Sequence, residues 1–307
     1  MFFGNARVML FTPNGESTPP ATRAVTRIWW SDDESDFSDC PSNNGEFDSS
    51  CIIPPEGKSN TNAVKVEFGS DVTSIGSSAF SGCSGLTSVA IPVGATRIGD
   101  YAFYGCSGLT SVTIPSSVTN ILNSAFSSCK GLTSVTIPDS VTSIEYGTFN
   151  NCTGLTSVMI GNSVASIWPY AFYGCSGLTS VTIPDSVTNI EQNAFNRCSG
   201  LTNITIGDGV RFIGDYAFRN CSSLTSVTIP DGVMSIGNYV FYGCSNLTSV
   251  MIGSNVTNIG RYVFTYCTHL TNVTFFKKTM NQIPNIEDGN GNRWYPWDID
   301  PSIINVA

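Results

Sequence analysis

A 23-residue pattern of apolar positions runs along most of the chain. Nine phenylalanines recur at this interval, and each is followed three residues later by cysteine and after three more by leucine. Nine copies without an insertion or a deletion indicate a solenoid, in which each copy forms one coil of a continuous stack. The phenylalanines are Phe80, Phe103, Phe126, Phe149, Phe172, Phe195, Phe218, Phe241 and Phe264.

Each copy is predicted to contain one extended strand and a returning segment. Val112 and Ile114 alternate with polar neighbours, as in a half-buried strand, and Pro115 ends that strand. The Ala-Phe-x-x-Cys segment is expected to form a short helical or 3-10 turn on the outer side. With a degenerate first copy near Val66, ten parallel strands are expected. Because the outer segments look bulkier than the strands, we expect a curved, right-handed coil with its parallel β-sheet on the concave face.

The repeat unit L-xx-V-x-I-P-xx-V-xx-I-xxx-AF-xx-C resembles the 23-residue leucine-rich repeats of the BspA-like (Treponema-type) class. The resemblance covers about 70% of the chain, residues 62–275 of 307. It implies an α/β leucine-rich-repeat solenoid and a place among surface proteins of bacteria and some protists that adhere to host or matrix proteins. The class does not supply a set of binding residues that could be transferred to this sequence, so none is assigned from the resemblance.

The two ends of the chain lack the repeat and are expected to cap the solenoid. Residues 1–61 are predicted to form a small β cap with an acidic loop, with strands over 8–11 and 24–30, and residues 276–307 form the C-terminal cap. Caps are needed because an open solenoid end exposes core and sheet edges. An alternative role for residues 1–61 is docking to a larger assembly.

Charge and hydropathy exclude several classes of partner. The net charge is −9 and no basic stripe is present, so nucleic acid is not an expected partner. Residues 31–48 carry seven acids and no base. Carboxylates alternate along this segment, as calcium ligands do, at Asp32, Glu34 and Asp36. The glycine and the terminal glutamate of a known calcium loop do not follow them, and this favours a solvated loop. No apolar run reaches ~18 residues, so no membrane insertion is expected.

The chain has eleven cysteines, and nine of them occupy one column of the repeat. Column neighbours in a stack have parallel Cβ vectors, which is poor disulfide geometry, so these thiols are expected to be buried and unpaired. A disulfide between Cys40 and Cys51 is a separate possibility. So many free thiols predict folding in a reducing compartment. No Cys-x-x-Cys pair and no second histidine are present to support a metal site.

The residues that catalysis requires are missing. His269 is the single histidine, and it stands where most other copies have glycine. No nucleophile motif, phosphate-binding loop or paired carboxylates are found, so we expect neither an enzyme nor a cofactor. Asp139, Asp185 and Asp231 recur in one turn column and predict only a weak acidic ridge.

Departures from the repeat give the candidate binding residues. Arg211, Phe212 and Met234 replace Thr or Ser in adjacent copies, at positions where packing makes no demand. Arginine and exposed aromatic residues are typical of binding hot spots. The predicted contact extends onto the strand face at Met251, Thr228, Thr205 and Met159. Neutral drift on a tolerant surface is an equally good interpretation at this point.

The function expected from these features is a binding or adhesion module that recognises a protein or a glycan on a surface. One alternative is a structural or receptor-binding component of a phage particle, because the N-terminus is not a convincing secretory signal. That feature equally fits a surface protein exported by another route. A minor alternative is an ice-binding threonine array.

Overall fold

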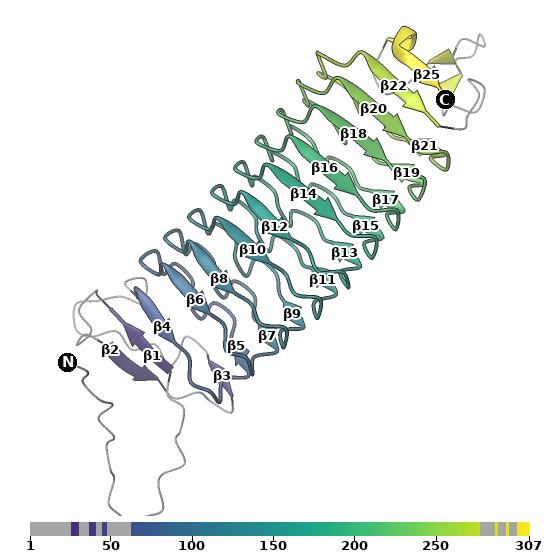
Figure 1. The fold of residues 1–307 in the computed structure, drawn as a ribbon. Helices are drawn as coiled ribbons and strands as arrows, with labels where there is room; N and C mark the ends of the chain where they lie inside the picture. Colours follow the sequence, from purple (N-terminus) through teal and green to yellow (C-terminus); the bar gives the residue numbers. More distant parts are fainter. Residues whose placement is uncertain are drawn as a thin grey trace, which may run out of the picture.

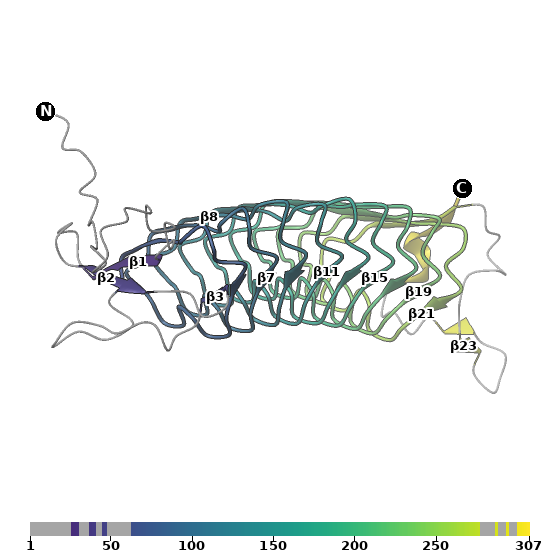
Figure 2. The ribbon, with the colours of Figure 1, turned by 90° about the horizontal axis from the view of Figure 1, so that it is seen from below.

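The chain winds as a right-handed coil into an elongated rod, with β1 near one end and β25 at the other (Figure 1). This computed structural model describes residues 26–30, 37–40, 45–47, 63–276, 286–287, 293–294 and 300–307. Successive coils stack side by side along the whole rod (Figure 2). Three sides of the rod follow from the three segments of each coil.

The first side, here called the long-strand face, is a row of strands, one from each coil. Pairing within the row is parallel and in 23-residue register, so that Val135 lies beside Val158 and Val181 beside Ile204. The predicted parallel strands are therefore present. They are β4 (Lys65–Glu67), β6 (Ser88–Ala90), β8 (Ser111–Thr113), β10 (Ser134–Thr136), β12 (Ser157–Met159), β14 (Ser180–Ile183), β16 (Asn203–Ile206), β18 (Ser226–Ile229), β20 (Ser249–Ile252) and β22 (Asn272–Phe275).

The second side, the short-strand face, is a second row of parallel strands, in two sheets of four and six strands, for which the sequence predicts no strand. Each returning segment contributes two residues, and the second is a buried isoleucine in every coil from β5 onward. The strands are β3 (Glu46–Phe47), β5 (Ser74–Ile75), β7 (Arg97–Ile98), β9 (Asn120–Ile121), β11 (Ser143–Ile144), β13 (Ser166–Ile167), β15 (Asn189–Ile190), β17 (Phe212–Ile213), β19 (Ser235–Ile236) and β21 (Asn258–Ile259).

The third side, the turn side, corrects the expectation of helical outer turns. Between residues 101 and 106 alternate backbone N–H groups bond to the next coil, as Phe103 N–H does to the Ala125 carbonyl, and the others close turns within the coil. Tyr101 has a φ of 57°, and this left-handed conformation interrupts any helix. Among the residues described, the only helix is the 3-10 turn Pro301–Ile303.

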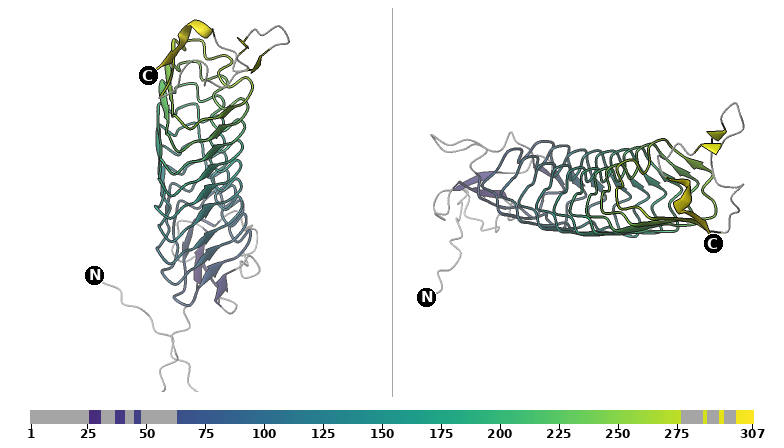
Figure 3. Two further views of the ribbon diagram at one scale, coloured as in Figure 1. Left: turned by 90° about the vertical axis from the view of Figure 1, so that its right-hand side faces the viewer. Right: turned by 90° about the horizontal axis from the view of Figure 1, so that it is seen from above.

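This turn geometry also overturns the reason for a concave strand face. The outer segments were expected to be bulkier than the strands, but they consist of tight turns whose alternate N–H groups bond to the next coil, as the strands do. The spacing between coils is therefore set by backbone hydrogen bonds on all three sides. The result is a gently bent rod instead of a tight horseshoe (Figure 3).

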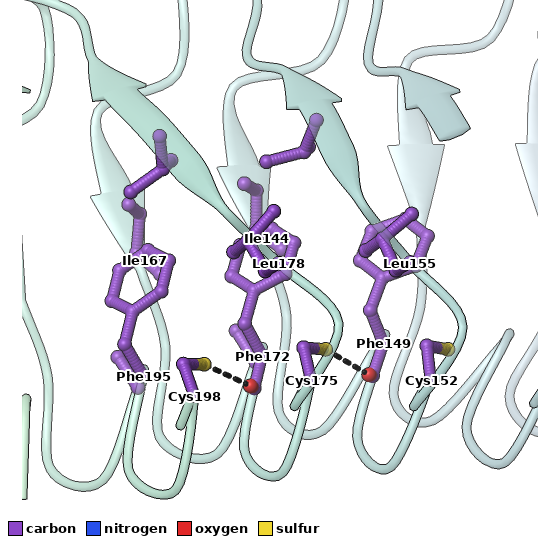
Figure 4. Packing of buried hydrophobic residues seen from close by; sticks show 14 of the residues in the cluster. Ile144, Phe149, Cys152, Leu155, Ile167, Phe172, Cys175, Leu178, Phe195 and Cys198 are labelled. Carbon is purple, nitrogen blue, oxygen red and sulfur yellow. Dashed lines mark hydrogen bonds between the residues drawn. The ribbon is translucent and has the colours of Figure 1, made fainter. Parts of the chain in front are cut away.

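The core is a ladder of stacked phenylalanine rings with leucine, isoleucine and valine around it (Figure 4). Successive rings lie 5.1–5.9 Å apart between centroids and within 10° of parallel. Phe47 supplies the first ring and stacks on Phe80 at 5.2 Å. The repeat does not predict this contact, because the residue 23 positions before Phe80 is a glycine.

The cysteine column lies beside the phenylalanine ladder and contains free thiols from Cys106 to Cys267. Each of these sulfurs donates a hydrogen bond to the phenylalanine carbonyl of the preceding coil, at 3.0–3.3 Å. Figure 4 shows two of these bonds, from Cys175 and Cys198. The prediction of unpaired core thiols is confirmed for these residues. Cys51 lies outside the described residues, so its pairing with Cys40 stays a prediction.

The ends of the solenoid are covered by non-repeat strands. At the first coil β1 (Thr26–Trp29) pairs antiparallel with β4, and β2 (Phe37–Cys40) pairs with β1. At the last coil β25 (Ile304–Val306) adds parallel to β22, and β23 (Ile286–Glu287) forms a hairpin with β24 (Arg293–Trp294). The predicted strand over 8–11 and the acidic residues 32–36 lie outside the described residues. The domain boundaries at 61 and 275 stay predictions.

Candidate functional site

The candidate residues gather around the turn edge, which consists of the four-residue turns that join each long strand to its short strand, such as 184–187, 207–210 and 230–233. The aspartates of this edge act as caps. The carboxylate of Asp185 accepts the Asp208 N–H at 2.9 Å, and that of Asp231 accepts the Ser254 N–H at 2.7 Å. These carboxylates join one coil to the next. This structural role explains why they recur at a regular spacing, and no catalytic role is needed.

Arg211 is held on this edge by backbone carbonyls. Its Nη1 donates to the carbonyl oxygens of Asp208 at 2.7 Å and of Val210 at 3.3 Å. In an earlier coil the Ser186 hydroxyl donates to the Val164 carbonyl at 2.7 Å, and the position that would serve Val210 in this way is Gly232. Arg211 therefore replaces a serine hydroxyl. From the sequence, Arg211 was given no packing role. The glycine at position 232 was the signal that Arg211 has such a role.

Met234 lies directly beside Arg211, as the register predicts. The Met234 N–H donates to the Arg211 carbonyl at 2.9 Å, and the Met234 side chain is 52% exposed. Both residues line an open hollow of about 570 Å³ together with Asp208, Asp231 and Asn255. Phe212 is 36% exposed on β17, between Asn189 and Ser235, and does not line this hollow.

The remaining candidates lie on the long-strand face and separate into two groups. Met159, which is 68% exposed, and Thr205 line a second hollow of about 570 Å³. Met251 is paired with Thr228 across β20 and β18, and its sulfur lies 3.9 Å from the threonine hydroxyl. The predicted set is thus spread over the turn edge, the long-strand face and, for Phe212, the short-strand face, with two hollows and one exposed pair.

The described residues contain no constellation suited to catalysis or to holding a metal. No group of three or more His, Cys, Asp or Glu side chains is close enough there to bind an ion. His269 is exposed, and its Nδ1 lies 2.6 Å from the Ser245 carbonyl oxygen of the preceding coil. Burial raises the pKa of Cys175 and Cys221 to about 12, so these thiols are not nucleophiles near neutral pH. No helix in the part of the chain described is long and apolar enough to cross a membrane.

Comparison with known proteins agrees with this architecture. The family model described as BspA type leucine rich repeat region matches residues 52–179 and 166–286, which together cover more than half of the chain. A search of curated proteins gave no match.

Several solved structures are similar to the chain. A leucine rich cell surface protein from Faecalibacterium prausnitzii is 30% identical, over 74% of this chain and 67% of that one, with a TM-score of 0.46. The T. pallidum leucine rich repeat protein is 27% identical, over 65% of this chain and 72% of that one, with a TM-score of 0.35. A leucine-rich repeat protein from Bacteroides ovatus is 22% identical, over 92% and 98%, with a TM-score of 0.33.

The 23-residue register and the family match over residues 52–286 lead to one conclusion. The chain belongs to the BspA type of leucine-rich repeat proteins.

Proposed function

We propose that the chain is a non-enzymatic, cell-surface binding module that contacts a protein ligand along the turn edge and the adjoining long-strand face. The observation that carries this proposal is the position of the exposed apolar side chains. Met159, Met234 and Met251 lie on this part of the rod, and Phe212 lies next to it, on the short-strand face directly after Arg211. Flexible methionines and an exposed aromatic ring suit the apolar centre of a protein interface.

The surface location is supported by relatives. The F. prausnitzii protein is described as a cell surface protein, and repeat proteins of this kind are in general binding proteins without catalytic activity. The relatives reported above give no support to a phage particle as the location. The minor ice-binding alternative is weakened because Met159 and Met251 interrupt the threonine file on the long-strand face.

We expect the double variant F212S/M234T to lose binding without losing stability. Serine or asparagine and threonine occupy these two positions in other coils, so the coil can accommodate them. Removing two exposed apolar contacts from an interface centre should weaken binding about tenfold or more. The measurement is binding of the labelled protein to cultured animal and bacterial cells, before and after protease removes their surface proteins.

The matched control is V93S, which removes an exposed apolar side chain from a distant turn of the same edge. It should bind like the parent protein. R211T is a third variant, and it should lower stability by about 1 kcal/mol because two backbone carbonyls lose their donor. If F212S/M234T binds cells as well as the parent does, at an unchanged unfolding midpoint, drift explains these residues and the proposed surface is wrong.

A further inference from the structure

The turn side has a surface chemistry unlike that of the other two sides. Among the described residues, the strongly exposed tyrosines and tryptophan all lie on it, whereas the exposed methionines, Phe212 and the exposed valines lie elsewhere. Tyrosine and tryptophan combine an apolar ring with a hydrogen-bonding group. The turn side is therefore aromatic but also polar. Its exposed rings are Tyr101, Tyr104, Tyr146, Trp168, Tyr262 and Tyr266.

Five of its tyrosines occupy a backbone position that disfavours large side chains. The residue before the Ala-Phe or Val-Phe pair has a φ between 53° and 61° in every coil. Serine, glycine or asparagine fills this position in four coils, and tyrosine fills it in the other five. A left-handed conformation costs a non-glycine residue ~1–2 kcal/mol, so the backbone does not select tyrosine here. Something outside the backbone must favour the tyrosine side chain.

Three of these tyrosines form an uninterrupted stack in the last coils. The rings of Tyr216 and Tyr239 are 5.0 Å apart at 9°, and those of Tyr239 and Tyr262 are 5.1 Å apart at 25°. Stacking covers the ring faces of the central residue and leaves ring edges and hydroxyl groups for a ligand. Ring edges carry partial positive charge, so the stack is suited to hydrogen-bond acceptors and anions.

Arginines join the same side of the rod in these coils. The Arg219 guanidinium lies 4.9 Å from the Tyr242 ring centroid and 5.6 Å from that of Tyr216, and Arg197 lies over Tyr173 at 5.7 Å. Arg261 is exposed next to Tyr262.

None of the three arginines pairs with a carboxylate of the described residues. The nearby Asp215 carboxylate instead accepts from the N–H and the side-chain amide of Asn238. The Nε of Arg219 is buried and has no hydrogen-bond partner there. In a chain of net charge −9, these three arginines are cations without an ion pair among the described residues, although Asp215 lies in the same turn column as Arg261.

We propose that this tyrosine–arginine surface (Arg197, Tyr216, Arg219, Tyr239, Arg261 and Tyr262) binds an anionic polysaccharide. Guanidinium groups and phenol hydroxyls donate to carboxylate or sulfate groups, and a row of rings about 5 Å apart offers the same contact repeatedly to a repeating polymer. Tyrosine and arginine are also enriched at protein interfaces, but the even spacing of the rings together with arginines that lack ion pairs favours a repeating polyanion. The site is separate from the turn edge.

The test uses the purified full chain and two polyanions, heparin for sulfate and polygalacturonate for carboxylate, with neutral dextran for comparison. In R197N/R219N/R261N each arginine takes a residue already found in the same column of other coils, namely Asn151, Asn150 and Asn123. We expect about tenfold or greater loss of affinity for the bound polyanion, and a weaker dependence of binding on salt. Calorimetry at two salt concentrations measures both quantities.

A second variant tests the rings. Y216N/Y239N/Y262N introduces the residue that Asn193 already provides in this column, which relaxes the left-handed positions and so preserves the fold. It should also lose affinity, whereas Y101N, in the same column but far from the arginines, should bind like the parent.

Several results would overturn the proposal. The parent protein could bind neither polyanion, the triple variants could bind as tightly as the parent does, or dextran could bind as tightly as the polyanions do. If the parent protein binds poly-glutamate equally well, and the same variants lose that binding, the surface recognises acidic protein segments instead. F212S/M234T should keep polyanion binding, which makes this test independent of the turn edge.

Discussion

Raising the pH from 8 to 11 is expected to unfold the protein through its cysteine column. Burial raises the pKa of Cys83, Cys175, Cys221 and Cys267 from 9.0 to about 12, and it raises the pKa of the other column thiols as well. The folded protein therefore holds these protons at a pH where the unfolded chain releases them. Stability is fully present below pH 9 and falls as the pH rises from 9 towards 12.

The expected size of this effect is large because the thiols act together. Each thiol that ionises only in the unfolded chain removes about 1.4 kcal/mol of stability per pH unit. The four thiols with a pKa of about 12 together remove ~5 kcal/mol per unit, which is comparable with the whole stability of an ordinary domain. The free energy of unfolding should therefore fall to zero one to three pH units above pH 9.

The measurement is the guanidinium midpoint under reducing conditions at pH 8, 9, 10 and 11. Absorbance near 240 nm follows thiolate formation once the tyrosinate contribution, measured separately near 295 nm, is subtracted. C175A removes one ionising thiol and should reduce the loss of stability per pH unit by about 1.4 kcal/mol. A midpoint that stays level to pH 11 would show that these thiols ionise in the folded state.

Phe172→Ala is expected to destabilise the protein by about 3–5 kcal/mol. The Phe172 ring is fully buried and stacks between Phe149 at 5.4 Å and Phe195 at 5.1 Å. Its removal leaves a cavity. The backbone hydrogen bonds between coils prevent the neighbouring coils from moving together to fill it. Because each coil contacts only its neighbours, the loss should also separate the unfolding of the two halves.

Chemical denaturation followed by circular dichroism measures both effects, as a lower midpoint and a broadened or biphasic transition. Phe212→Ser provides the matched control, since it removes the same ring from an exposed position on the short-strand face. It should change stability by no more than about 0.5 kcal/mol. Equal losses from the two variants would mean that the ladder does not carry the stability assigned to it.

The sequence was sufficient to predict several of the elements that repeat in side-chain type, but not all of them. The Phe–Cys–Leu interval, the long strands and the buried column of thiols follow from it, because these positions admit few residues. The short-strand face was missed since each strand has only two residues, too few for an alternating pattern. The turns were misjudged because serine, tyrosine and asparagine share the left-handed position with glycine, and only Gly147 and Asn193 indicate the conformation.

The candidate site could be predicted only as a set of deviations. Met234 and Arg211 are adjacent as expected, since the register determines which backbones meet. The anchoring of Arg211 on two carbonyls depends on a side chain that folds back over Gly232, and no spacing rule contains that information. Arg219 is likewise three residues from Tyr216 and one coil from Tyr242, a relation visible only after the coils are stacked.

Backbone hydrogen bonds on three sides, all at the same 23-residue interval, have an evolutionary consequence. A gene that gains or loses one whole copy changes neither the seams between the remaining coils nor the fit of either cap. Each copy lengthens the rod by roughly 5 Å. Recombination between copies can therefore vary the length of the rod, while its two ends stay as they are.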